Sequence, residues 1–435
     1  MNRVFPFVFI LLSLSSQLGA QQPVPVLSPA DAVRIALENN FDIRLSRVDV
    51  DIAHKNNTKA NAGMLPTVNL VGSENFTVST FQQQLATGDE INALGAYFNN
   101  FTAGVQLSWT LFDGRRMYIV KKRLEETEAL GKLNLQNAVQ QTSGAVLQTY
   151  YDIARGRLQE RALDEVIELN AERLRIAEAR LAAGFAAQTD ALQARIDLNQ
   201  RRADLLTQQT AIAAAKRDLN RLLARAPETA FEVEENLDNT YRPAREDLLQ
   251  KIQNQNPGLL SLQKNAQIAA LLVDESRTLN KPRITGIGQF NTLRTDNGAG
   301  FFRSNTQAGL VVGGTFVMPL YTGGNLRRQV ETAQLAAQQS ALRIDAQRQV
   351  LATELDNQLA FFETQEQLLV LEEENVKNAR ESLSVSTERF RLGQTNALEV
   401  QSAQNILEQT LARRNLVLSN LKTTEIGLKL LAGEL

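Results

Sequence analysis

The sequence has no cysteine and only one histidine among its 435 residues. Without cysteine it forms no disulfide, no thiolate metal site and no lipid anchor through an N-terminal cysteine. The single histidine, His54, lies beside Lys55 on a polar stretch, where a solvated surface residue is far commoner than a catalytic one. Neither a G-x-x-x-x-G-K nor a G-x-S-x-G motif occurs. We therefore expect no enzyme, metal or cofactor.

Long apolar runs are also scarce. Met1-Asn2-Arg3, the apolar run 4–14 and Leu18-Gly19-Ala20 predict a signal peptide over residues 1–20, which directs the chain out of the cytoplasm. No later stretch has the roughly 20 apolar residues of a membrane-spanning helix, and the uncharged segment 304–326 is interrupted by Gly309, Gly313, Gly314 and Pro319. The 46 basic residues are scattered and balanced by 48 acidic ones, so nucleic acid is not an expected partner.

The chain is rich instead in a heptad pattern that occurs twice. Before Gly393, apolar residues recur every seventh position as Leu355, Phe362, Leu369, Val376, Leu383 and Phe390. A shift of 209 positions, the separation of the two glycines, gives Val146, Ile153, Glu160, Ile167, Leu174 and Leu181 before Gly184. Only Glu160 breaks the apolar character. The pattern predicts two long helices, each packed along one seam.

A second heptad run follows each glycine. The first consists of Ala191, Leu198, Leu205, Ile212 and Leu219, and the second of Val400, Leu407, Arg414, Leu421 and Leu428. Each glycine therefore lies between antiparallel helices, and the chain is a tandem duplication of a long helical hairpin. A helix from about residue 114 to 182 would be on the order of 100 Å long, which is longer than a globular core requires.

Between the short and the long helices of each copy the hydrophobic period changes to two. The apolar residues Phe101, Ala103, Val105, Leu107, Trp109 and Leu111 alternate with polar ones. Similar alternation elsewhere predicts two β-hairpins, at about 67–112 and 283–319, with polar loops at roughly 82–100 and 294–304. Strands with one apolar face suit a tilted outer-membrane barrel. The alternative is a soluble sheet packed on the helices.

The predicted fold class is mostly α, with a transmembrane β-barrel part built from a duplicated helix-helix-strand-strand-long helix-helix unit. The first repeat covers residues 21–226, with its helical hairpin at 114–224, and the second covers 244–435, with its helical hairpin at 323–432. Shorter helices are expected at 29–39 and 42–62 in the first copy, and 227–243 is a linker placed as a short strand or coil outside the helical body.

The number of copies follows from the barrel. Because lipid leaves an open sheet edge unsatisfied, the four strands of one chain must be completed by other chains. Two chains would give eight strands, which side chains fill, whereas three give twelve and leave a passage. The prediction is therefore a homotrimer with a 12-stranded β-barrel on a 12-helix periplasmic α-barrel.

Several short motifs carry a family resemblance. Pro66 and Pro282 precede the hairpins, LFDG and LYTG lead into the long helices, and the turns read RLAAG with Thr189-Asp190 and RFRLG with Leu398-Glu399-Val400. In this order, over essentially the whole mature chain, they resemble the TolC-type outer-membrane efflux proteins, the outer membrane factors. The resemblance implies a passive duct through the periplasm and outer-membrane lipid, loaded by a periplasmic adaptor (membrane fusion protein) and an inner-membrane transporter. A periplasmic or surface coiled-coil scaffold or adhesin without a pore is the alternative.

Two sets of residues at the turns are candidate sites. The adaptor-docking hypothesis names Leu181, Gly184, Phe185, Leu392, Gly393 and Gln394. On the simpler interpretation the two glycines only end their helices. The entrance hypothesis names Asp190 and Glu399, which are equivalent under the shift, together with Arg180, Arg389 and Phe390.

The two carboxylates have two interpretations. Three chains would bring six of them towards one axis, and acidic rings make a constriction cation-selective. Alternatively, each acid complements the positive end of a helix dipole. In the family the entrance often adds a tyrosine before the turn, a basic residue after it and a further acid. Here these places hold Phe390, Thr395 and Ser402, so the departure implies either a looser entrance or a different set of closing bonds.

Overall fold

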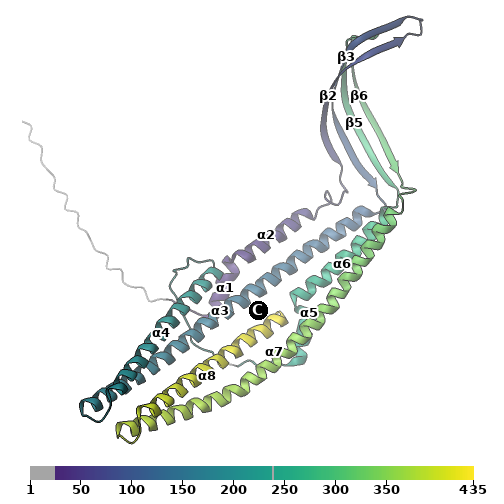
Figure 1. Cartoon of the computed structure of the whole chain (residues 1–435). Coiled ribbons are helices and arrows are strands. Elements are labelled where there is room, and N and C mark those ends of the chain that lie inside the picture. The colour runs from purple at the N-terminus through teal and green to yellow at the C-terminus, as the bar shows by residue number, and fades with distance from the viewer. Residues whose placement is uncertain (1–24, 238–239) are drawn as a thin grey trace, which may run out of the picture. The chain divides into compact units, whose positions relative to one another are not determined.

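The computed structural model describes residues 25–237 and 240–435, so the predicted signal peptide lies outside the described residues. The helices are α1 (Pro29–Asn39), α2 (Phe41–Asn56), α3 (Arg116–Ala182), α4 (Gln188–Leu222), α5 (Arg245–Gln255), α6 (Pro257–Thr278), α7 (Asn325–Arg391) and α8 (Ala397–Ala432) (Figure 1). The strands are β1 (Val26–Leu27), β2 (Thr67–Gln84), β3 (Glu90–Phe112), β4 (Glu232–Val233), β5 (Arg283–Asn297) and β6 (Ser304–Val317). Within the described ranges, no helix combines the length and the apolar character that crossing a membrane requires.

The order of elements repeats as predicted. Two shorter helices, two strands, a long helix and a returning helix occur in each half, and α3 and α7 have 67 residues each. The chain divides into two compact units, each containing parts of both halves. Within the described residues, the tip unit comprises 25–35, 146–237 and 372–419, and the sheet unit comprises 36–145, 240–371 and 420–435. The boundaries of the two repeats remain a prediction.

Two predicted boundaries are wrong. The loop placed at 82–100 is mostly strand, since β2 and β3 leave only residues 85–89 between them, and the loop placed at 294–304 is shorter than predicted, since β5 continues to Asn297. At these ends of the strands both faces carry polar residues. The sequence there lacks the apolar/polar alternation from which a strand is predicted. The helix predicted to reach Ala62 ends at Asn56, because Asn57 leaves the helical conformation and its side chain accepts a hydrogen bond from the Lys121 ammonium at 2.7 Å.

The four long strands form one antiparallel sheet in the order β2-β3-β5-β6. Its register aligns most of the large apolar residues of the four strands on one face. One row across the sheet is Leu70, Val105, Phe290 and Leu310, and the next apolar row is Val68, Leu107, Gly288 and Val312. Between them lies the row Asn69, Gln106, Gln289 and Val311, whose side chains point to the other face. The alternation predicted for separate strands is therefore a property of the whole sheet.

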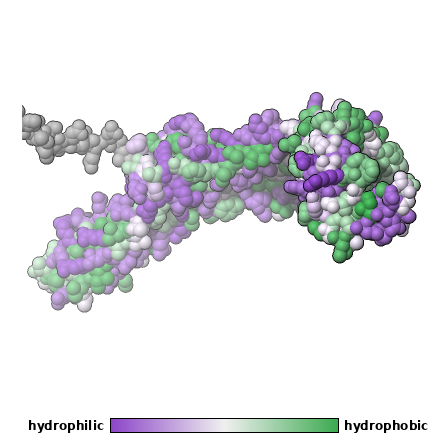
Figure 2. Space-filling view, turned by 90° about the horizontal axis from the view of Figure 1, so that it is seen from above, coloured by the Kyte–Doolittle hydropathy of each residue, from purple (hydrophilic) through white to green (hydrophobic). Residues whose placement is uncertain are grey.

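The apolar face has a defined height. At one end it stops at the row that contains Glu74, Phe101 and Arg294. At the other end Trp109 donates its indole N–H to the Met64 carbonyl at 3.0 Å. From Phe101 to Leu111 the strand advances by about ten residues, or about 33 Å. A strand tilt of about 40° reduces the height of this stretch to about 25 Å, which is the height of an outer-membrane apolar band. Figure 2 shows hydrophobic residues over the sheet, whereas the helices are mostly hydrophilic.

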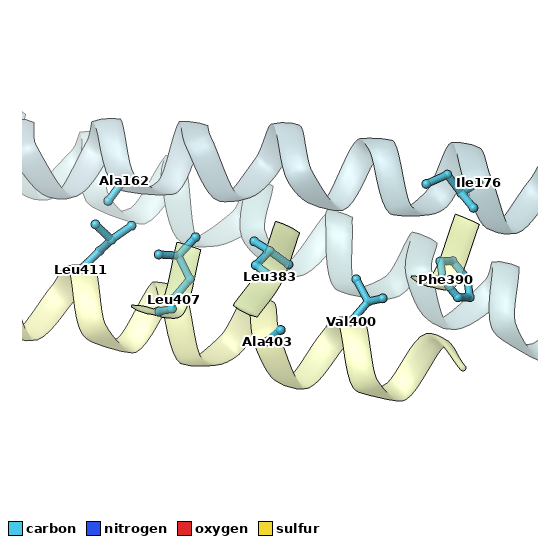
Figure 3. Close-up of a cluster of buried hydrophobic side chains, with 9 residues drawn as sticks. Ala162, Ile176, Leu383, Phe390, Val400, Ala403, Leu407 and Leu411 are labelled. Atoms are coloured by element: carbon cyan, nitrogen blue, oxygen red, sulfur yellow. The ribbon is translucent and has the colours of Figure 1, made fainter. Parts of the chain in front are cut away.

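Each unit has its own hydrophobic core along the predicted seams. In the tip unit the core joins α3, α7 and α8 and consists of Ala162, Ile176, Ala379, Leu383, Phe390, Val400, Ala403, Leu407 and Leu411 (Figure 3). In the sheet unit it joins α5, α6, α7 and α8 and consists of Leu248, Ile252, Leu259, Leu351, Leu355, Leu428 and Ala432. Of the second heptad run, Leu355, Phe362, Leu383 and Phe390 are buried as predicted, whereas Leu369 and Val376 are only half-buried.

The first copy departs from its predicted seam. Ile167, Leu174 and Leu181 are only half-buried, and the buried line of α3 passes instead through Val166, Asn170, Arg173 and Ala177. On a straight helix with 3.6 residues per turn, each heptad rotates the side-chain direction by about 20°. Residues spaced by seven therefore cannot all stay on the packed face of a long helix. Glu160, the polar residue in that set, forms an ion pair with Arg157 at 2.7 Å.

The linker between the halves is anchored to the tip unit. As expected it contains a short strand, β4, which pairs with β1 in parallel. The Tyr150 hydroxyl of α3 donates to the Leu27 carbonyl at 2.7 Å and accepts from the Glu234 backbone N–H at 2.9 Å. Phe231 and Val233 are buried, so the linker packs through part of its length.

Replacing Leu107 by arginine tests the membrane placement of the sheet. Leu107 lies near the middle of the apolar band, where an arginine facing lipid costs about 2–4 kcal/mol. We expect Leu107→Arg to reduce the yield of membrane-inserted protein and lower its stability in lipid vesicles. Gln106→Arg is the matched control, because the neighbouring side chain points to the polar face. Equal insertion and stability of the two variants would place the apolar face outside lipid.

Candidate functional site

Both long helices end in the same hydrogen-bonded turn. Gly184 has φ +77° and Gly393 has φ +75°, in the left-handed region that glycine adopts without strain. In each turn the residue after the glycine donates its backbone N–H to the carbonyl four residues before the glycine, Phe185 to Arg180 and Gln394 to Arg389, both at 2.8 Å. This bond, with a glycine in the left-handed conformation, is the Schellman motif. The helix-ending role of the two glycines is therefore established by geometry.

The turns carry exposed apolar side chains. Phe185 is 77% exposed and Leu392 is 62% exposed, whereas Leu181 is half-buried and Gln394 is a polar exposed neighbour. Exposed large apolar residues that gather at one place mark a contact surface more often than isolated ones do. Phe185 and Leu392 are therefore the best candidates for adaptor contact among the residues of the docking hypothesis.

Arg180 and Phe390 join the two turns inside the protomer. The Phe390 side chain is only 3% exposed, and its ring centroid lies 4.8 Å from the central carbon of the Arg180 guanidinium. Arg180 also donates from Nη1 to the Phe390 carbonyl at 2.9 Å. A cation from the end of α3 therefore satisfies a carbonyl at the end of α7. Phe390 lies in the core, so any part that it plays at the entrance acts through Arg180.

Glu399 is fully engaged near the start of α8. Its Oε1 lies 3.0 Å from Arg389 Nη1, and its Oε2 accepts a hydrogen bond from the Thr395 hydroxyl. Its backbone N–H donates to the Asn396 side chain at 3.1 Å, as in an N-terminal cap. Arg389 thus offsets much of the negative charge of Glu399.

Asp190 differs from Glu399 although the two are equivalent in sequence. Among the residues that the structure describes, no cation lies within 4.0 Å of its carboxylate, and its side chain accepts no hydrogen bond. It lines a cavity of about 160 Å³ together with Arg173, Gln193 and Gln401. Of the two predicted entrance carboxylates, Glu399 therefore forms an ion pair and Asp190 forms none with the described residues.

A buried polar network next to this cavity was not predicted. Arg173 of α3 is 4% exposed and forms an ion pair with Asp197 of α4. Arg173 Nη1 donates to Gln404 Oε1 at 3.1 Å, while Gln401 and Gln193 donate to Asp197 at 2.9 and 2.8 Å. The network joins α3, α4 and α8. The sequence offers little sign of it, because Arg173 lies one residue away from the seam and its partners lie on other helices.

The chain has an open sheet with one apolar face and two equivalent helical turns, and its sequence also matches a known family. Residues 32–225 and 248–434 match the family model described as outer membrane efflux protein. The chain belongs to the outer membrane efflux protein family. This membership confirms the predicted resemblance and fold class. The family is one of efflux channels, not of enzymes, and it offers no support for the scaffold or adhesin alternative.

Individual relatives agree with this family. The chain is 23% identical to outer membrane protein TolC of Salmonella enteritidis over 346 residues, which are 77% of this chain and 66% of TolC, just under two thirds of that relative's length. The outer membrane protein VceC of Vibrio cholerae superposes with a TM-score of 0.77 at 17% identity, covering 93% of this chain and 96% of VceC. The CmeC outer membrane channel of Campylobacter jejuni gives 0.78 at 16% identity, covering 100% and 94%.

The buried network of this efflux protein predicts a large stability effect. Replacing Asp197 by asparagine leaves the Arg173 guanidinium buried without its anion, and breaking such a pair costs about 3 kcal/mol. We therefore expect Asp197→Asn to lower the temperature at which helical circular dichroism is lost in detergent. The control is Arg195→Gln, because the Arg195–Glu178 pair is exposed at both ends and contributes about 0.5 kcal/mol or less. Equal unfolding temperatures for the two variants would contradict the buried-pair assignment.

Proposed function

We propose that three copies of the chain join their sheets edge to edge and form a passive outer-membrane exit duct. In one protomer β2 and β6 each pair on one side only, so both edges of the sheet are open. An open edge leaves backbone groups unsatisfied in lipid. Three sheets supply twelve strands, which enclose a passage, whereas eight strands would be filled by side chains. The helices of the three copies form the periplasmic tube.

The duct has no catalytic step of its own. We propose that a periplasmic adaptor and an inner-membrane transporter deliver substrates to it, as the family resemblance implies. The exposed Phe185 and Leu392 side chains support an adaptor contact at the turns. The polar face of the sheet, with Asn69, Gln106 and Gln289 across three strands, supports a water-filled passage.

The observation that carries this proposal is the alignment of apolar residues across an open sheet. A coiled-coil scaffold has no use for such a face. The direct test combines the mass of the detergent-solubilised complex with conductance in a planar bilayer. The duct predicts a particle of three chains that conducts ions. A stable monomer without conductance would favour the scaffold.

We propose further that Asp190 is the main source of a cation preference at the periplasmic entrance. Its charge is unpaired in the protomer, whereas Arg389 lies 3.0 Å from Glu399. Three copies bring the carboxylates towards one axis, where an acidic ring attracts cations and repels anions. The first-turn position of both acids also favours their helices through the dipole, and that stabilisation does not conflict with an effect on ions.

Reversal potentials under a salt gradient test the entrance proposal. We expect Asp190→Asn to reduce the cation preference more than Glu399→Gln does, and the double variant to reduce it most. The control removes two exposed carboxylates elsewhere on the helices, as Asp164→Asn/Asp218→Asn. An unchanged cation preference in the entrance double variant would leave both acids as helix-stabilising residues only.

Crosslinking in cells tests the docking surface. A photo-crosslinker at Phe185 or Leu392 should capture the adaptor, because both side chains project from the turns. The control position is Leu206, an exposed leucine of α4 away from the turns. Capture from Leu206 but from neither turn, in cells where export works, would move the docking surface onto the sides of the helices.

A further inference from the structure

The charged residues of the sheet are distributed unequally between its two faces. The four strands β2, β3, β5 and β6, all within the described residues, contain five charged side chains. Glu74, Glu90, Arg294 and Asp296 share the parity of the apolar face and lie towards the loops that join the strands. Arg283 alone has the opposite parity and lies at the other end of the sheet, opposite Val317. The polar face therefore carries one charge per protomer.

Arg283 keeps its charge uncompensated. Its Nη2 donates to the Thr110 hydroxyl at 3.3 Å, and within the described part of the chain no carboxylate lies within 4.0 Å of the guanidinium. The hydrogen bond is long and its partner is neutral, so it does not balance the charge of the guanidinium. The side chain is also exposed, so packing does not account for an arginine at this position.

A second unpaired cation lies beside Arg283. Lys281, Arg283 and Arg116 line one cavity of about 290 Å³. Arg116 is compensated by Glu275, whose Oε1 lies 2.7 Å from its Nη2. Lys281 is exposed, and the described residues place no carboxylate within 4.0 Å of its ammonium. Each protomer thus contributes two uncompensated cations at this end of the polar face.

The one remaining carboxylate on the cavity is directed elsewhere. Asp113 Oδ2 accepts from the Met117 backbone N–H at 2.9 Å, so its charge complements the positive end of the α3 dipole. Its Oδ1 is buried and makes no hydrogen bond, to Lys281 or to Arg283. The cavity therefore has an excess of positive charge.

The backbone holds Lys281 in place. Its N–H donates to the Thr278 carbonyl at 2.9 Å. Gly114, in the turn from β3 to α3, has φ +69°, and a Cβ built there would lie 2.4 Å from the Lys281 Cβ. Such a contact is impossible, so only glycine allows the turn to approach so closely. The packing fixes the root of the Lys281 side chain next to the end of the strands.

We propose that Arg283, with Lys281, forms a positively charged collar in the lumen, at the end of the barrel where α3 and α7 begin, and that this collar favours anionic solutes. The inference rests on the proposed duct, in which the polar face lines the passage. Three copies bring six cations around the axis, and rings of basic side chains select for anions. The neighbouring polar-face residues, such as Thr285 and Gln289, carry no charge that would cancel the collar.

The collar and the acidic entrance act in opposite directions. An entrance that prefers cations and a collar that prefers anions oppose free leakage of either sign of small ion. A solute that carries both charges, or none, meets the lowest combined barrier. The selectivity measured in any one variant therefore depends on which ring it retains.

Reversal potentials in planar bilayers test the collar. We expect Arg283→Gln and Lys281→Gln each to lower the anion-to-cation permeability ratio, and Arg283→Lys, which keeps the charge, to restore the parent value. The change should be large at 0.01 M salt, where the Debye length is about 30 Å, and small at 1 M, where it is about 3 Å. Arg294→Gln is the control, because that arginine lies on the other face and pairs with Asp296 at 2.9 Å.

The possible results separate the collar from the duct. A parent protein that forms no conducting pore would overturn the proposed duct and the collar with it. Conducting Arg283→Gln and Lys281→Gln channels with the parent permeability ratio at low salt would overturn the collar alone. A shift in Arg283→Gln that Arg283→Lys fails to reverse would assign the effect to the Thr110 hydrogen bond, and would also overturn it.

Discussion

The constraint on which this structure depends is the need to pair every backbone hydrogen-bonding group that enters lipid. The sheet of one protomer cannot satisfy it, since β2 and β6 end the sheet with unpaired edges, and rows such as that from Leu70 to Leu310 give one face an apolar band. The protomer is therefore incomplete as a membrane protein. When further copies close the sheet into a barrel, the edge N–H and C=O groups are paired, and the closed barrel also encloses the passage.

The helices solve a different problem, that of length. The 67-residue α3 and α7 extend on the order of 100 Å, and helices so long are stabilised by packing along their whole length. The tip core of Leu383, Val400 and Leu407 and the sheet-unit core of Leu355 and Leu428 supply that packing in separate clusters. Between the apolar contacts, the buried pair of Arg173 and Asp197 joins α3 to α4.

Much of this architecture could be predicted from the sequence because it is periodic. The structure reproduces three local predictions: the long helix from the heptad run that ends at Phe390, the strand from the alternation that ends at Leu111, and the turns at Gly184 and Gly393. Predictions that depended on partners across space were less complete. The 209-residue shift equates Asp190 with Glu399, but it could not show that only Glu399 forms an ion pair with an arginine. The heptad pattern also could not predict that Ile167 is only half-buried, because the buried line of α3 follows 3.6 residues per turn and not 3.5.

Closure of the barrel by pairing of β2 with β6 of the next copy is the central claim, and disulfide trapping tests it most directly. The chain has no cysteine of its own, so a scan that combines one cysteine at Val68 or Leu70 with one at Leu310 or Val312 reports only these edges. The account predicts that oxidation in the membrane gives a covalent trimer as the largest species for at least one combination. Covalent dimers or an open-ended ladder as the only products, or no crosslink from any combination in membranes that contain the folded protein, would contradict a closed ring of three.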